Sequence, residues 1–252
     1  MKLDNKIAVV TGASLGIGRA VAIDLARNGA DVVVNYSRHA DEAGSVVREI
    51  ENLGRRAYAV QASVADRSQC VRLVEETVRR FGSLDILVSN AAFSIRKPFL
   101  DLEPGDIEKT WAVSLWGVFY CCQLAARRMV GQQGGGSMVV ISSVHAARPY
   151  PHASAYNGAK AAVSHMALSW ARELIQYGIR VNVVEPGWTD TPGERAFNTE
   201  DQIREGARSV PIGRLARPDE IAKGVTFLVS EKDASYITGS TLRIDGGFVL
   251  VH

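Results

Sequence analysis

The chain alternates short runs of β-branched residues with longer amphipathic segments along its whole length. Strands are predicted at residues 7–11, 31–35, 56–61, 85–89, 137–142, 180–184 and 241–244. Helices are predicted between them at residues 16–28, 41–52, 67–81, 106–129, 153–177 and 219–230. Continuous Val- and Ile-rich strands are typical of a parallel sheet buried on both faces, and right-handed crossovers place helices on each side. The alternation therefore predicts an α/β fold of three layers with a doubly wound parallel sheet.

The chain of 252 residues contains no internal repeat and no linker rich in Pro, Gly or Ser. We therefore expect a single domain over residues 1–252 that binds its ligands and carries out its chemistry. One polar segment, residues 188–210, breaks the alternation after the sixth strand. Ligands of doubly wound sheets bind at the carboxyl ends of the strands, so this segment is predicted to be a mobile substrate lid.

Composition excludes several classes of protein. The net charge is +2, no basic run stands out, and no apolar run reaches the length of a membrane span. These features argue against nucleic acid or a membrane as a partner. Cys70, Cys121 and Cys122 have neither metal-ligand spacing nor the even number of a disulfide framework, so we expect packing cysteines and no metal site. The N-terminus lacks a signal-peptide pattern, and a cytoplasmic location is expected.

A glycine-rich turn follows the first predicted strand and reads Thr11-Gly-Ala-Ser-Leu-Gly-Ile-Gly-Arg19. Glycines permit a tight turn and a close approach of backbone N–H groups to an anion, and the next helix adds its positive N-terminal end. No Gly-Lys-Ser/Thr follows, which excludes the nucleotide-binding P-loop. The turn therefore predicts a cradle for the pyrophosphate of a dinucleotide. The predicted contacts are Gly12, Ser14, Leu15, Gly16, Ile17 and Gly18.

The end of the second predicted strand decides which dinucleotide fits. It reads Asn35-Tyr36-Ser37-Arg38, with no acidic residue before Asp41. An acid here would bind the adenosine ribose hydroxyls, whereas Arg38 can pair with a 2′-phosphate and Ser37 can donate a hydrogen bond to it. Tyr36, Ser37 and Arg38 are therefore predicted contacts that favour NADP over NAD, with an ordinary surface arginine as the alternative for Arg38.

Three side chains predict the chemistry. Tyr156 and Lys160 lie four residues apart on one face of a predicted helix, and Ser143 follows the fifth predicted strand. Hydride transfer at a carbinol carbon needs a group that takes or gives the proton on oxygen. Tyrosine, with a pKa of about 10, is a poor base at neutral pH, and a nearby ammonium should lower that pKa. Ser143 can hydrogen-bond the same oxygen, and Lys160 can hold the nicotinamide ribose, so the set predicts a nicotinamide-dependent oxidoreductase.

These motifs together resemble the short-chain dehydrogenase/reductase family over essentially the whole chain. The matching stretches are residues 11–18, 89–92, 186–191 and 244–247, with Ser143 and Tyr156-x-x-x-Lys160 between them. The resemblance implies a Rossmann-type sheet that binds NAD(P), a homotetramer, and a small-molecule carbonyl or alcohol substrate. It also implies Ser143 as the partner of the substrate oxygen, Tyr156 as the acid/base and Lys160 as its activator.

The resemblance implies further cofactor contacts. Asn90, Ala91 and Ala92 would line the adenine-ribose side, and Ser63 with Val64 would lie near the adenine, where the family commonly has Asp-Val. A last group would contact the nicotinamide carboxamide and the phosphates. It consists of Pro186, Gly187, Thr189 and Thr191.

Ser114 is the departure with the clearest mechanistic meaning. It stands before Leu115-Trp-Gly-Val-Phe119, where the family usually has an asparagine that is thought to bind a water beside the lysine and pass protons to solvent. A shorter serine could hold a displaced water, or the proton relay could run elsewhere. Ser114 is therefore included among the predicted catalytic residues.

The substrate is the least determined part of the prediction. Ser143-Val144-His145 with Pro149 and Pro151 is similar to the glucose 1-dehydrogenase branch of the family, so His145 and Arg148 could hydrogen-bond sugar hydroxyls. The alternative is that His145 is a solvated loop residue. Further side chains could shape the pocket, namely Phe93, Arg96 and Trp188, and Trp188 is the predicted substrate contact among them.

Two other functions compete with a sugar or alcohol dehydrogenase. A 3-oxoacyl carrier-protein reductase shares nearly all these motifs and should carry a basic patch beside the site for its acidic carrier, with Arg127 and Arg128 as candidates. A cofactor-binding redox sensor without catalysis would typically lack the tyrosine or the lysine, and this chain keeps Tyr156 and Lys160.

Overall fold

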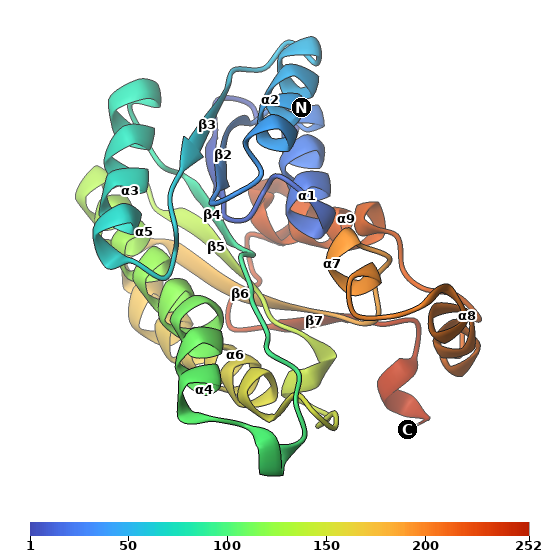
Figure 1. Ribbon diagram of the computed structural model, residues 1–252. Coiled ribbons are helices and arrows are strands. Elements are labelled where there is room, and N and C mark those ends of the chain that lie inside the picture. Colours follow the sequence, from blue (N-terminus) through green and yellow to red (C-terminus); the bar gives the residue numbers. More distant parts are fainter. Residues whose placement is uncertain (252) are drawn as a thin grey trace.

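The computed structural model describes residues 1–251, which form one seven-stranded sheet in the order β3-β2-β1-β4-β5-β6-β7 (Figure 1). Every neighbouring pair of strands is parallel. The strands are β1 (Ile7–Val10), β2 (Asp31–Tyr36), β3 (Ala57–Gln61), β4 (Ile86–Ser89), β5 (Gly136–Ile141), β6 (Ile179–Pro186) and β7 (Thr241–Ile244). The predicted doubly wound sheet is confirmed, and its order reverses between β1 and β4, where such sheets bind ligands.

Helices cover both faces of the sheet, which gives the predicted three layers (Figure 1). One face packs against α1 (Gly16–Arg27), α2 (Ala40–Asn52) and α9 (Pro218–Val229). The other packs against α3 (Arg67–Phe81), α5 (Val118–Gln132) and α6 (Ser154–Leu174). The remaining helices are short. They are α4 (Pro104–Trp111), α7 (Pro192–Arg195), α8 (Glu200–Ser209), α10 (Glu231–Ala234) and 3-10 turns at Phe99–Asp101, Val144–Ala146, Ile175–Tyr177 and Phe248–Leu250.

The central strands are buried on both faces because helices lie on each side. In β1, Val10 packs in the core beneath α1 and α9, while its neighbour Val9 packs in the core beneath α3, α5 and α6. All four residues of β1 are buried. A strand with two covered faces can be apolar at every position, which is why these strands read as continuous Val and Ile runs.

One predicted helix differs from the structure, and the predicted lid segment contains helices that were not predicted. The long helix predicted at residues 106–129 is interrupted by a π-helical turn, Ala112–Gly117, between α4 and α5. A π-turn adds one residue to a single turn of an otherwise continuous helix, so the apolar spacing on either side of it still indicates one helix. The polar segment 188–210 contains α7 and α8, whose N-terminal N–H groups are capped by Thr191 and Thr199.

No helix within the described residues 1–251 is long and apolar enough to cross a membrane.

Arg180 on β6 fixes the end of α9 against the sheet. Its side chain is buried and donates hydrogen bonds to the carbonyl oxygens of Leu228 (2.7 Å), Val229 (3.2 Å) and Ile237 (3.1 Å). The last carbonyls of a helix lack partners within the helix, so this guanidinium satisfies groups that would otherwise be buried and unpaired. Burial lowers the pKa of Arg180.

We expect Arg180→Met to lower the free energy of unfolding by about 3 kcal/mol, because buried carbonyls lose their partner. Urea unfolding followed by circular dichroism measures this loss. Arg127→Met, at an exposed position of α5, is the control and should change stability by less than about 0.5 kcal/mol. Equal effects of the two substitutions would contradict the capping role of Arg180.

Candidate active site

The glycine-rich turn brings the start of α1 against the end of β1. Gly12 (φ 60°) and Gly16 (φ 56°) adopt left-handed backbone conformations that favour glycine. A Cβ on Gly18 would lie 2.3 Å from the carbonyl oxygen of Gly12, so only glycine allows this approach. Leu15 precedes α1 without giving a side-chain cap, which leaves the first N–H groups of the helix for a ligand.

Two asparagines hold this turn in place. Asn35 accepts a hydrogen bond from the N–H of Gly12 (3.2 Å) and donates to the carbonyl oxygens of Val60 and Ala62, and so ties the turn to β3. Asn90 donates to the carbonyl oxygens of Thr11 (2.9 Å) and Gly12 (3.2 Å) from the end of β4. Asn90 therefore has a structural role in addition to its predicted cofactor contact.

A pocket of 620 Å³ opens at the carboxyl ends of the strands and brings the predicted site residues together. It is lined by these predicted cofactor contacts: Gly12, Ser14, Leu15, Gly16, Ile17, Tyr36, Ser37, Arg38, Ser63, Val64, Asn90, Ala91, Ala92, Tyr156, Lys160, Pro186, Gly187, Thr189 and Thr191. Ser143 and the predicted substrate contacts His145 and Trp188 also line it. Gly18 and Ser114 lie outside the lining.

The shape and polarity of one end of this pocket fit a dinucleotide. The uncapped N–H groups of α1 border the lining at Gly16 and Ile17, where an anion would complete the helix terminus. A Cβ on Gly12 would lie 3.0 Å from the Cα of Ala91, so the two walls meet closely at this point. These residues could hold the pyrophosphate of NAD(P), and Tyr156 and Lys160 line the same pocket.

Tyr156 and Lys160 project from the first turns of α6 into the pocket. The ammonium nitrogen of Lys160 lies 5.5 Å from the centre of the Tyr156 ring and donates a hydrogen bond to the carbonyl oxygen of Ile141 (2.7 Å). Ser142 ties α6 to the end of β5 by donating to the carbonyl oxygen of Lys160 (3.1 Å). Ser143 is the next residue, so β5 and α6 together fix the positions of the three predicted catalytic side chains.

The expected lowering of the pKa of Tyr156 by Lys160 was wrong for this structure. The pKa of Tyr156 is raised well above its usual value, first by burial and second by the negative charge of Glu194. Arg96 and a hydrogen bond with Ser143 act in the opposite direction, but more weakly. Burial also lowers the pKa of Lys160 to about 8. A low-dielectric pocket penalises the charged form of both groups, and this cost exceeds the attraction that their spacing suggested.

Ser114 lies in the π-helical turn, where its side chain is fully buried. Its hydroxyl donates a hydrogen bond to the carbonyl oxygen of Phe93 (2.6 Å) and accepts one from the N–H of Phe93 (2.9 Å). The hydroxyl therefore fastens the loop after β4 to this turn, a contact that sequence analysis did not predict. A part for Ser114 in proton transfer stays a prediction.

His145 lies beside Tyr156 in an ordered aromatic cluster. Its ring stacks on Tyr150 (centroids 4.4 Å apart, planes at 17°) and meets the edge of Tyr156 (5.4 Å, 83°). Nδ1 lies 2.7 Å from Oδ1 of Asn157, whose Nδ2 donates to the carbonyl oxygen of Tyr150. Because Asn157 uses its amide hydrogen there, Oδ1 is the acceptor and Nδ1 carries the proton. Burial lowers the pKa of His145, so the ring is neutral at pH 7, with Nε2 as an acceptor.

The segment predicted as a lid is joined to the body of the protein at its base. The N–H of Ala216 donates to the carbonyl oxygen of Trp188 (2.9 Å), and the N–H of Asp190 donates to that of Ala216 (2.9 Å). The indole of Trp188 packs on α8, where a Cβ on Gly206 would lie 1.6 Å from the ring. Glycine at this position therefore lets α8 rest on Trp188.

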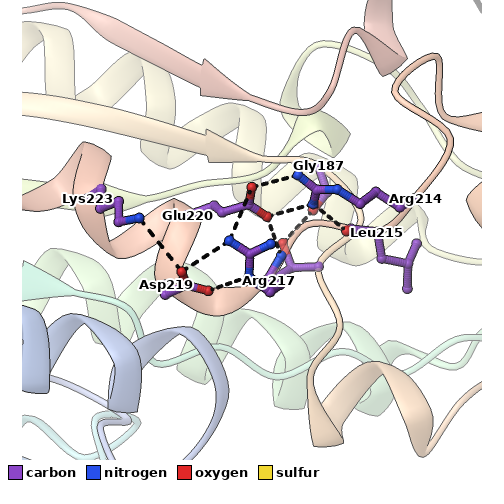
Figure 2. Close-up of polar contacts among 8 residues, drawn as sticks. Gly187, Arg214, Leu215, Arg217, Asp219, Glu220 and Lys223 are labelled. Atoms are coloured by element: carbon purple, nitrogen blue, oxygen red, sulfur yellow. Dashed lines mark hydrogen bonds and ion pairs between the residues drawn. The ribbon is translucent and has the colours of Figure 1, made fainter.

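An ion-pair network fixes the residues that follow the lid to the start of α9, as Figure 2 shows. Arg214 makes two hydrogen bonds of 2.7 Å to the carboxylate of Glu220, and the N–H of Arg217 donates to the same carboxylate (2.8 Å). Asp219 pairs with Arg217 and Lys223. The Arg214 guanidinium lowers the pKa of Glu220 to about 2, so the pair stays charged at neutral pH.

Some residues that line the pocket were not predicted from the sequence, and one residue that was predicted does not line it. Glu194 and Asn198 of the lid segment and Tyr150 line the pocket, although no spacing in the sequence marks them. Arg148 does not line the pocket. Its guanidinium lies over the ring of Phe248 at 5.6 Å, so its predicted contact with sugar hydroxyls was wrong.

Arg127 and Arg128, the candidates for the basic patch that a carrier-protein reductase should carry, do not border the pocket. Arg128 donates to the side chain of Gln132 and to the carbonyl oxygen of Gly82, which follows α3 at the amino-terminal edge of the sheet. Arg127 is its neighbour on α5. Because α5 runs antiparallel to the strands, its C-terminal end lies far from their carboxyl ends, where the pocket opens.

Comparisons with known sequences agree with the geometry of the site. Residues 12–249 match a family model described as enoyl-(acyl carrier protein) reductase. The chain is 41% identical over 246 residues to an L-rhamnose 1-dehydrogenase (NAD(P)(+)) of Sphingomonas sp. (strain SKA58), a match that covers 97% of this chain and 96% of that protein. It is 38% identical to the 3-oxoacyl-[acyl-carrier-protein] reductase FabG of Staphylococcus aureus (strain N315), with 97% and 98% covered.

Solved structures give the same result. The acetoin dehydrogenase from Enterobacter cloacae is 39% identical with a TM-score of 0.90, covering 98% of this chain and 97% of that one. A short-chain type dehydrogenase/reductase from Mycobacterium marinum is 34% identical with a TM-score of 0.92, covering 98% and 96%. Both matches extend over the sheet, the pocket and the lid segment.

We expect Gly18→Ala to weaken dinucleotide binding at least about tenfold, because the added Cβ would push α1 away from the Gly12 carbonyl and move the N–H groups that border the pocket. Titration of cofactor fluorescence measures the change. Gly131→Ala on α5, where an added Cβ meets nothing within 4 Å, is the matched control. Unchanged affinity in a folded Gly18→Ala protein would rule out this role for the close approach.

Proposed function

We propose that this chain, which belongs to the short-chain dehydrogenase/reductase family, oxidises a neutral sugar or related polyol. The family membership and the relatives show an NAD(P)-dependent oxidoreductase acting on CH–OH groups. The observation that carries this proposal is the fixed, neutral His145 beside Tyr156. Its Nε2 can accept a hydrogen bond from a hydroxyl next to the reacting carbon, a group that sugars and polyols carry and simple alcohols lack.

In the proposed reaction, Tyr156 takes the hydroxyl proton of the substrate while the carbinol hydrogen leaves as a hydride. NAD(P)⁺ held in the pocket would supply the acceptor for that hydride. Ser143 hydrogen-bonds the substrate oxygen as it becomes a carbonyl. Lys160, held by the carbonyl of Ile141, lines the pocket beside Tyr156 and is placed to contact the nicotinamide ribose. In the reverse direction, Tyr156 returns the proton.

One relative supports the sugar class, and a second supports a substrate with an oxygen next to the reacting carbon. The L-rhamnose 1-dehydrogenase acts by its name on a sugar, and the acetoin dehydrogenase on a small hydroxyketone.

The second candidate function is reduction of a 3-oxoacyl group on a carrier protein, supported by the identity with the reductase from Staphylococcus aureus. The positions of Arg127 and Arg128 argue against a carrier-protein reductase, because those side chains do not border the pocket. The sequence keeps both Tyr156 and Lys160, which argues against a redox sensor.

We propose NADP as the preferred cofactor. Residues 35–39 line the adenosine end of the pocket, and they include Arg38 and no acidic side chain. A guanidinium at this position favours the 2′-phosphate of NADP over the free ribose hydroxyl of NAD.

We also propose that the chain works as a single domain in a cytoplasmic homotetramer. Support for assembly comes from large apolar side chains that are exposed on one protomer, among them Trp111 and Trp116 of the α4–α5 region, at 38% and 49% exposure. Exposed indoles of this kind are typical of protein interfaces. The lid segment, residues 188–210, would close over the small-molecule substrate in each protomer.

The activity is tested by following absorbance of reduced nicotinamide with a panel of aldoses, polyols, acetoin and a β-ketoester thioester. We expect turnover on at least one sugar or polyol, and a loss of at least about 100-fold in kcat for Tyr156→Phe. His145→Ala should lower kcat/KM at least about tenfold on that substrate and much less on a simple secondary alcohol. Turnover confined to the thioester would favour the carrier-protein reductase.

The cofactor preference is tested by Arg38→Leu. We expect KM for NADP to rise at least about tenfold while KM for NAD stays within about twofold, because the lost guanidinium contacts only the 2′-phosphate. Steady-state kinetics with both cofactors measure the change, and Arg127→Leu serves as the control. Equal effects on both cofactors would contradict a 2′-phosphate contact.

A further inference from the structure

An ion pair joins the two walls of the pocket. Arg96 lies in the loop after β4, and Glu194 lies on α7 of the lid segment. Nη2 of Arg96 is 2.8 Å from Oε1 of Glu194, and both side chains line the pocket with 30% of their surface exposed. The guanidinium also lies over the ring of Phe197, 4.3 Å from its centre. The lid therefore contacts the opposite wall through one charged side chain.

Glu194 is also held by hydrogen bonds with other residues of the lid segment. Nδ2 of Asn198 donates to the carbonyl oxygen of Glu194 (2.9 Å) and approaches its Oε2 at 3.4 Å. Thr191 caps α7 by accepting from the N–H of Glu194 (3.2 Å). Both carboxylate oxygens thus have a defined direction, which a solvated surface glutamate lacks.

The two charges of the pair act on the reacting centre with opposite signs. Glu194 raises the pKa of Tyr156, while Arg96 lowers it. The two charges act in the same directions on His145, where Arg96 lowers the pKa and Glu194 raises it. Both charges therefore lie within electrostatic range of the substrate position, and they act there in opposite directions.

We propose that the Arg96–Glu194 pair makes the enzyme selective for neutral substrates by offering one charged donor and one charged acceptor to hydroxyl groups while cancelling the attraction for a carboxylate. This inference rests on the proposed function, because it concerns the same pocket. A lone arginine in such a pocket binds a carboxylate through two parallel hydrogen bonds. Here Glu194 is already paired with the guanidinium of Arg96 and repels a carboxylate on the substrate. Neighbouring hydroxyl groups of a neutral substrate can instead donate a hydrogen bond to Glu194 and accept one from Arg96.

The consequence is a switch in specificity. Glu194→Gln leaves Arg96 uncompensated in the pocket, so it should create affinity for an anionic substrate. Arg96→Gln leaves Glu194 uncompensated and should have the opposite effect. A residue that only stabilised the lid would change kcat/KM for neutral and anionic substrates by the same factor.

The experiment compares an aldose that the wild type oxidises with its uronate, which differs only by a carboxylate in place of the terminal CH₂OH. We expect Glu194→Gln to raise the uronate-to-aldose ratio of kcat/KM at least about tenfold, and Arg96→Gln to lower it. The double variant Arg96→Gln/Glu194→Gln should fall between them. The matched control is Glu200→Gln on α8, outside the pocket lining. It removes one of the two carboxylate partners of Arg195 and should leave the ratio unchanged.

A ratio that stays within about twofold in Glu194→Gln, in a protein with unchanged melting temperature and retained turnover of the aldose, would overturn the proposal. We expect the melting temperature to hold because a partly exposed ion pair contributes little to stability. If the wild type oxidises no sugar, the proposed function fails, and the pair is then tested with acetoin against 3-hydroxybutanoate, a neutral and an anionic secondary alcohol of similar size. The same shift in ratio is expected there, and its absence would overturn the proposal independently.

Discussion

The site depends first on how closely α1 approaches the turn that precedes it. The backbone of Gly18 lies against the carbonyl of Gly12, at a distance that no side chain on Gly18 would permit. This contact places the uncapped N-terminus of α1 at the carboxyl end of β1, beside β4, where the strand order reverses. Asn35 and Asn90 then fix the turn from the neighbouring strands. The remaining pocket is arranged around this edge of the sheet.

Burial governs the chemistry at the other end of the pocket. It raises the pKa of Tyr156 and lowers the pKa values of Lys160 and His145, so each group is biased toward its neutral form. Charges at the rim adjust this bias, since Arg96 favours the Tyr156 phenolate and Glu194 opposes it. The residues that tune Tyr156 thus come from the β4 loop, from the lid segment and, through Ser143, from the end of β5. The same rim charges face the substrate, which links the acid/base chemistry to substrate selection.

The lid segment contributes to both acid/base chemistry and substrate selection because hydrogen bonds hold both of its ends. Ala216 exchanges backbone hydrogen bonds with Trp188 and Asp190, so the segment leaves and rejoins the body at one point. The network of Arg214 and Glu220 fixes the returning chain to α9 (Figure 2). With both ends held, α7 can present Glu194 to the pocket.

The sequence by itself determined the layers, the order of strands and helices, and the cofactor turn, because these follow from local hydrophobic period and from glycine spacing. It also identified Ser143, Tyr156 and Lys160 as one group. Only the tertiary structure decided the pKa of Tyr156, since desolvation depends on residues from every layer. The same holds for Ser114, whose hydroxyl contacts Phe93, and for Glu194, whose partner Arg96 is 98 positions away in the chain. Contacts between distant segments carry no period or motif, and they became visible only once the sheet had brought its loops to one edge.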